Sequence, residues 1–211
     1  MRINRGWFLA IAVLLLPLFL LVVAKARGDR DETKFRWDII SLSLPGVTVN
    51  AGGTASALAT DGSMITVTGS GTLQPGDNDE VSGGGNWTTF DSTGHQTGTG
   101  SYKVKRLVKF DLAPGTQRST IIDKIGDGTL ADNRSVLAVF LIRYSDRSSG
   151  LLFVSCGLSG GPGPAAPATV FEGITATKGF VDYFNRVPPS GSPSTANANR
   201  TLFHILPEEE D

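Results

Sequence analysis

The feature that most limits the fold is a pair of apolar runs joined by a turn. Residues 136–142 (VLAVFLI) and 151–154 (LLFV) are continuously apolar, and residues 145–150 (SDRSSG) between them carry turn-forming side chains. Short apolar runs bounded by turns are typical of strands that are buried on both faces. The sequence therefore predicts a β-hairpin at the centre of a sheet.

Residues 102–112 form a second predicted strand, because apolar and charged side chains alternate along it. The change of parity at Arg106 and Leu107 predicts a β-bulge there. We expect the lysines of this strand to form a solvated outer face, with contact to anionic lipid or phosphate as the alternative. Five side chains are expected on its buried face: Tyr102, Val104, Val108, Phe110 and Leu112.

Several shorter β-branched or apolar runs, among them 63–68, 86–90 and 201–206, are bounded by glycine, proline or polar turn residues. The chain has 211 residues, of which 26 are glycine and 11 proline, while charged residues make up 18%; this balance favours strands and turns over helices. We predict an all-β fold, an antiparallel sandwich or barrel. Residues 168–186 are ambiguous between a short helix and strands. The alternating glycines of residues 69–72 (GSGT) suggest a sheet edge.

An uncharged apolar segment of 19 residues, 6–24, lies between Arg5 and Lys25. As an α-helix it would span roughly 28 Å, close to the hydrocarbon thickness of a bilayer. The sequence predicts one N-terminal transmembrane helix; a cleaved signal peptide is the alternative, because Ala24-Lys25-Ala26 fits a cleavage site. The side chains expected to anchor the segment are Trp7, Leu14, Leu15, Leu16, Leu20 and Val23.

The chain is therefore divided into four segments. Residues 1–26 are the transmembrane anchor or signal segment, 27–45 a polar connector, 46–206 a β-rich domain and 207–211 an acidic tail. The apolar patch at 37–40 is expected to be either a first edge strand or a piece that packs near the membrane. The signal-like layout favours an exported domain. We expect a single-pass protein of a bacterial inner membrane, with its soluble domain in the periplasm or outside the cell.

One motif matches a catalytic pattern. Residues 157–161 (GLSGG) read G-x-S-x-G, with Ser159 in the nucleophile position, and Asp182 and His204 follow in the chain order of an α/β-hydrolase. Pro162 follows directly, where that fold needs a helix, and the chain lacks alternating strands and helices. We expect no catalysis through Ser159.

Cys156 and His204 are the other pair that could act in a hydrolase, because a cysteine nucleophile needs a base to ionise it. Cys156 ends an apolar strand, where a free cysteine usually behaves as a small buried hydrophobe. We expect it to be structural, and we expect His204 to be a satisfied residue of the sheet.

Acidic side chains cluster in two loops. Asp77, Asp79 and Glu80 are weak calcium candidates, because calcium prefers carboxylate oxygens, and a solvated turn is the alternative. Asp123, Asp127 and Asp132 form a second, weaker group. We expect no resident metal and no cofactor, since neither loop has the full spacing of a known calcium motif.

The stretches ITVTGSGTLQPG, GGGNWTTF and VFEGITATKGFVDYFN resemble bacterial exported, glycine-rich all-β proteins of unknown function. The similarity runs from Ile65 to Phe184 and implies an exported bacterial β-domain; it assigns no site residues.

The net charge of -1 excludes the basic balance that is usual for nucleic-acid binders. We expect a non-catalytic, membrane-anchored accessory or scaffold subunit, whose partners are the bilayer and other membrane protein subunits. A β-barrel that binds a small ligand or lipid is the alternative, and a serine or cysteine hydrolase is a remote one.

Overall fold

The structure, a computed structural model, describes residues 33–43, 47–77, 80–115, 117, 120–125, 130–158, 160, 163–189 and 198–207. The chain divides into two units, Met1–Glu32 and Thr33–Asp211, and the second contains every described residue. The predicted transmembrane helix, with its anchor residues from Trp7 to Val23, lies outside the described residues. Within them, no helix has the length and apolar character needed to cross a bilayer.

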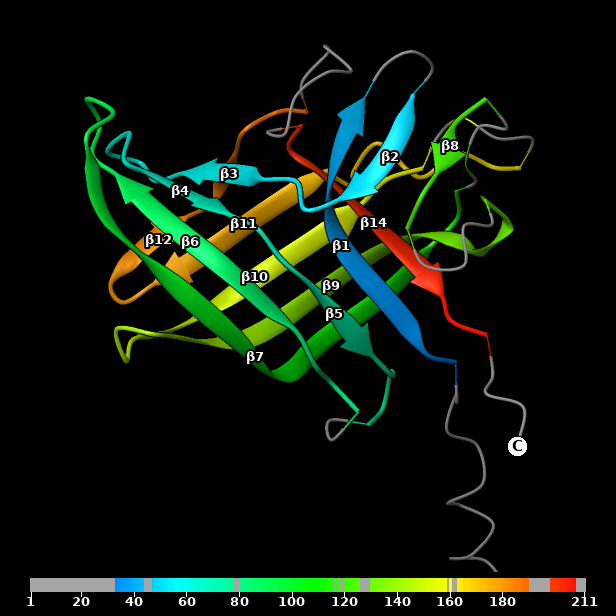
Figure 1. The fold of residues 1–211 in the computed structure, drawn as a ribbon, viewed down its shortest axis with the longest axis horizontal. Coiled ribbons are helices and arrows are strands. Elements are labelled where there is room, and N and C mark those ends of the chain that lie inside the picture. Colours follow the sequence, from blue (N-terminus) through cyan, green and yellow to red (C-terminus); the bar gives the residue numbers. More distant parts are fainter. Residues whose placement is uncertain are drawn as a thin grey trace, which may run out of the picture. The chain divides into compact units, whose positions relative to one another are not determined.

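The second unit is all-β, and its centre is a closed barrel of six antiparallel strands (Figure 1). Around the ring each strand pairs with the next, from β9 through β14, β1, β5, β6 and β7 back to β9. The prediction of an antiparallel barrel or sandwich is therefore confirmed as a barrel. The ring strands are β1 (Phe35–Ser43), β5 (Ser70–Leu73), β6 (Gly84–Phe90), β7 (Gln96–Ala113), β9 (Asn133–Tyr144) and β14 (Arg200–Ile205).

Two flaps extend the sheet beyond the ring, one from β9 through β10, β11 and β12, the other from β6 through β4, β3 and β13. Because β13 follows β12 in the chain and pairs with β3, the chain links the outer ends of the flaps. The remaining elements are β2 (Thr48–Ala51), β3 (Ala55–Leu58), β4 (Met64–Val67), β8 (Ile122–Asp123), the 3-10 helix η1 (Leu130–Asp132), β10 (Ser149–Cys156), β11 (Gly173–Lys178), β12 (Val181–Tyr183) and β13 (Asn185–Arg186).

Large side chains fill the barrel. The rings of Trp37 and Phe140 lie 5.1 Å apart, and both side chains are fully buried. At the end where β1 begins, the rings of Phe35 and Phe110 lie 4.9 Å apart. Since even eight strands leave an interior only wide enough for side chains or one small ligand, a six-stranded ring is a packed core.

The barrel closes at a glycine-rich seam. β5 and β6 pair through Ser70 and Gly84 alone, and the backbone beside them approaches closely. A Cβ on Gly85 would lie far inside van der Waals contact of the Thr68 carbonyl oxygen. The alternating glycines of residues 69–72, expected at a sheet edge, therefore lie at the closure of the ring, where larger side chains would keep the strands apart.

The predicted hairpin is confirmed, because β9 and β10 pair in register around the turn at 145–148. Its outer face is less covered than expected, since Leu141 and Leu151 are partly exposed there. The ambiguous segment 168–186 contains β11, β12 and β13 and no helix. The patch at 37–40 lies in β1, which pairs on both sides, so the expectation of an edge strand was wrong.

The strand predicted at 102–112 lies within β7, but it has two bulges, between Val104 and Arg106 and between Leu107 and Lys109. The first bulge turns Leu107 toward the core, and the second leaves Val108 outside, 48% exposed. Leu112 is 58% exposed, so the prediction that both side chains are buried was wrong. Figure 1 shows the strong bend that lets β7 pair first with β6 and then with β9.

Candidate functional site

Among the described hydrolase candidates, Asp182 and His204 do not pair with each other. Ser159 lies outside the described residues, and Asp182 is exposed on β12. His204, in β14, bonds to a different carboxylate: its Nε2 lies 2.8 Å from Oδ2 of Asp123. Cys156 is 1% exposed, and burial raises the pKa of its thiol well above the ordinary value, which keeps it protonated.

The Asp123–His204 pair is buried against the outer face of β1 and β14. Asp123 also accepts hydrogen bonds from the Ile125 amide (2.9 Å) and from Nδ2 of Asn133 (3.2 Å). Burial by itself would raise the pKa of Asp123, but the hydrogen bonds from His204 and Ile125 and the charge of His204 bring it below the ordinary value. The pair therefore fastens β8 to β14 of the barrel.

Asp38 extends this cluster from β1. Its side chain is fully buried and accepts two hydrogen bonds from the Arg36 guanidinium, at 2.8 and 3.1 Å. Burial raises the pKa of Asp38, against the hydrogen bonds and the positive charge of Arg36. Nδ1 of His204 is buried and has no hydrogen-bond partner in the described part of the chain.

Glu172 forms a second, partly buried cluster, which the sequence did not predict. It lies just before β11, where its two carboxylate oxygens accept hydrogen bonds from the amides of Gly157 (2.9 Å) and Thr201 (2.8 Å). Burial raises the pKa of Glu172 to about 7, although these amides and the positive charge of Arg200 oppose the shift. The carboxylate thus joins the end of β10 to the start of β14.

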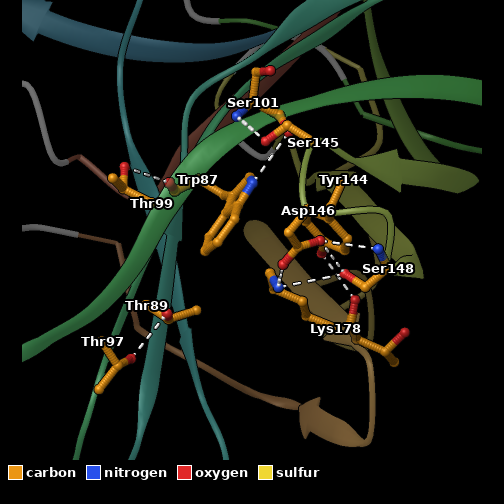
Figure 2. A network of polar contacts seen from close by, with 11 residues as sticks. Trp87, Thr89, Thr97, Thr99, Ser101, Tyr144, Ser145, Asp146, Ser148 and Lys178 are labelled. Carbon is orange, nitrogen blue, oxygen red and sulfur yellow. Dashed lines mark hydrogen bonds and ion pairs between the residues drawn. The ribbon is translucent and has the colours of Figure 1, made fainter.

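Lys178, at the end of β11, packs against two aromatic rings beside the turn between β9 and β10. Nζ of Lys178 lies 4.2 Å from the centroid of the Trp87 ring and 5.1 Å from that of Tyr144, and it forms an ion pair with Asp146 (Figure 2). Asp146 also accepts hydrogen bonds from Ser148. Only 14% of the Lys178 side chain is exposed, so the cation is largely shielded from solvent.

The calcium prediction is not tested at its full set of residues, because Asp79 lies outside the described ones. Glu80 is 3.5 Å from the Lys34 ammonium, and the Asp77 amide bonds to the Gln74 carbonyl. In the second group, the carboxylate of Asp123 is bonded to His204. Across the described ranges, no three histidine, cysteine, aspartate or glutamate side chains gather closely enough to hold a metal ion.

Two exposed surfaces remain. The first, the β12 patch, consists of Phe180 (108% exposed), Val181 (37%) and Phe184 (55%). The second, the β7 basic face, is a row of exposed cationic and aliphatic side chains. Its members are Lys103, Lys105, Arg106, Val108, Lys109 and Leu112.

The lysines of this face could be predicted from the sequence but Arg106 could not, because only the position of the bulge places that side chain outside. Comparison of the chain with protein-family models, with curated proteins and with solved structures found no match.

Proposed function

We propose that the chain is a non-catalytic, membrane-anchored binding module, an accessory or scaffold subunit of a membrane protein complex with its β-domain outside the cytoplasm of a bacterium. The observation that carries the proposal is the filled barrel. Trp37, Phe140 and Phe203 occupy its interior completely buried, so binding surfaces must lie on the outside.

The placement of the reactive side chains supports a non-catalytic role. Cys156 is buried and protonated, and His204 has its Nε2 bonded to Asp123 beneath the surface. Catalysis needs a nucleophile and a base that substrate can reach. The alternative, a barrel that carries a lipid or small ligand, is disfavoured because side chains occupy the interior in which that ligand would lie.

The β12 patch is the surface best suited to a protein partner. Among the described strands β12 pairs with β11 alone, so its other edge presents free backbone groups. Such an edge can accept an extended segment of a partner as an additional strand. Phe180 and Phe184 beside the edge supply exposed aromatic side chains, which are enriched at interfaces.

The test is purification of the full chain from its native membrane in mild detergent, followed by mass spectrometry of the intact chains. We expect a stoichiometric partner and a chain that retains residues 1–26. Phe180→Ser should release the partner, because this fully exposed side chain contributes to binding and little to folding. Ile122→Ser, at a side chain 50% exposed on β8, is the matched control. A chain that purifies alone would refute the proposal.

A further inference from the structure

We infer that the β7 basic face binds the anionic lipid headgroups of the membrane in which the chain is anchored. The inference rests on the proposed function, because it requires an anchored chain. Three features of the molecule lead to it: uncompensated positive charge, aliphatic side chains within the charged row, and the place where the domain meets its connector.

The positive charge is largely unneutralised. Lys109 pairs with Asp111, but Lys103, Lys105 and Arg106 have no acidic side chain within ion-pair distance in the described residues. Lys103, Lys105 and Arg106 are therefore exposed and unpaired among the described residues, in a chain whose net charge is -1. An anionic surface attracts such a row, and each lysine or arginine that reaches it strengthens binding about fivefold.

The aliphatic side chains favour lipid over other anionic partners. Val108 is 48% exposed and Leu112 58% exposed, and both lie beside the cations. A bulge residue such as Val108 projects from the strand without a cross-strand neighbour to cover it. Surfaces that combine cations with exposed aliphatic groups suit the headgroup region, where the charges meet phosphates and the apolar groups enter the acyl boundary.

The length of the connecting chain limits how far the start of the domain can lie from the predicted anchor. The described chain begins at Thr33, and the Phe35 ring lies 4.9 Å from that of Phe110, which is in the β7 segment that also carries Lys109 and Leu112. The predicted anchor ends at Ala24, so the connecting residues reach at most roughly 30 Å. The length of the chain therefore lets the part of β7 beside Phe35 reach the headgroups.

The experiment measures how near this face lies to lipid in the full chain. The protein is reconstituted into nanodiscs of phosphatidylcholine alone or with phosphatidylglycerol as a minor component, and nitroxide headgroups serve as quenchers. A fluorophore is placed at Val108→Cys or, as control, at Ile122→Cys, which replaces a side chain of similar exposure. Cys156 is 1% exposed and will not be labelled.

We expect quenching at position 108 and not at position 122, and it should depend on phosphatidylglycerol and decrease at high salt. Lys105→Gln with Arg106→Gln should lower the docking equilibrium constant about 25-fold. Lys124→Gln with Arg147→Gln removes the same charge from exposed positions outside β7 and should change nothing.

Three results would overturn the inference. The first is equal quenching at positions 108 and 122. The second is quenching that changes neither with lipid charge nor in the variant Lys105→Gln with Arg106→Gln. The third is protection of position 108 from an aqueous quencher without quenching by the lipid nitroxides. The last would assign the face to another acidic occupant, such as an acidic protein or residues 208–211 of this chain. If the chain does not migrate with the nanodisc, the proposed anchoring fails; if it migrates but position 108 is not quenched, only this inference fails.

Discussion

Glu172→Gln should remove a large part of the pH dependence of folding above pH 5. Burial raises the pKa of Glu172 from its ordinary value of 4.5 to about 7 in the folded protein. Because the folded state binds this proton more tightly than the unfolded state does, the group's contribution to stability is fully present below pH 4.5 and is lost as the pH rises through 7.

The magnitude follows from the two pKa values. Complete ionisation of Glu172 costs about 3 kcal/mol of unfolding free energy, and the portion lost between pH 5 and pH 8 is about 2 to 3 kcal/mol. The amide of Glu172→Gln stays neutral throughout this range. It resembles the protonated carboxyl, which likewise has one oxygen free to accept from the Gly157 or the Thr201 amide.

The assay is urea unfolding at pH 5 and pH 8, followed by tryptophan fluorescence, since Trp37 and Trp87 are buried. The free-energy difference between wild type and Glu172→Gln should change by about 2 to 3 kcal/mol between the two pH values. Glu80→Gln, at a carboxylate whose side chain is 54% exposed, is the control and should leave the difference nearly constant. A constant difference for Glu172→Gln would refute the argument that burial dominates its pKa.

Three further substitutions test the structural contacts by the same unfolding measurement. Asp123→Asn leaves the fully buried His204 without its carboxylate and should cost about 3 to 5 kcal/mol; a cost under about 1 kcal/mol would mean the pair is solvated. Lys178→Met keeps the stem of the side chain but loses the ion pair and the cation–π contacts, and should cost about 1 to 2 kcal/mol. Gly85→Ala should cost about 2 to 3 kcal/mol, because its Cβ would collide with the backbone oxygen of Thr68; wild-type stability would disprove the tight seam.

The elements that could be predicted are those whose signal is local. The hairpin of β9 and β10 follows from two apolar runs and the turn between them, and it forms as expected. The register of β7 did not follow, because a single bulge accounts for the parity change in the sequence, whereas the curvature of the ring requires a second one after Leu107. The positions of bulges depend on the geometry of the whole barrel, which cannot be read from the alternation of side chains along one strand.

The polar clusters were harder to predict because their partners are distant in sequence. Chain order suggested Asp182 as the partner of His204, but the fold brings Asp123 of β8 there, 81 residues away. Glu172 is a lone acid in a proline- and alanine-rich loop, and its role depends on two amides that only the fold brings together. The β7 lysines were visible because exposure follows from strand alternation.

The buried carboxylates also determine where the domain is most stable. Asp123 has a pKa below its ordinary value of 3.8, so its contribution is present above that pH and is lost as the pH falls further. Asp38 and Glu172 have raised pKa values, so their contributions are lost as the pH rises, for Glu172 through about 7. The melting temperature should therefore be highest in mildly acidic solution, near pH 5. In Glu172→Gln the maximum should broaden toward neutral pH, and a wild-type maximum at pH 8 would contradict the opposing signs.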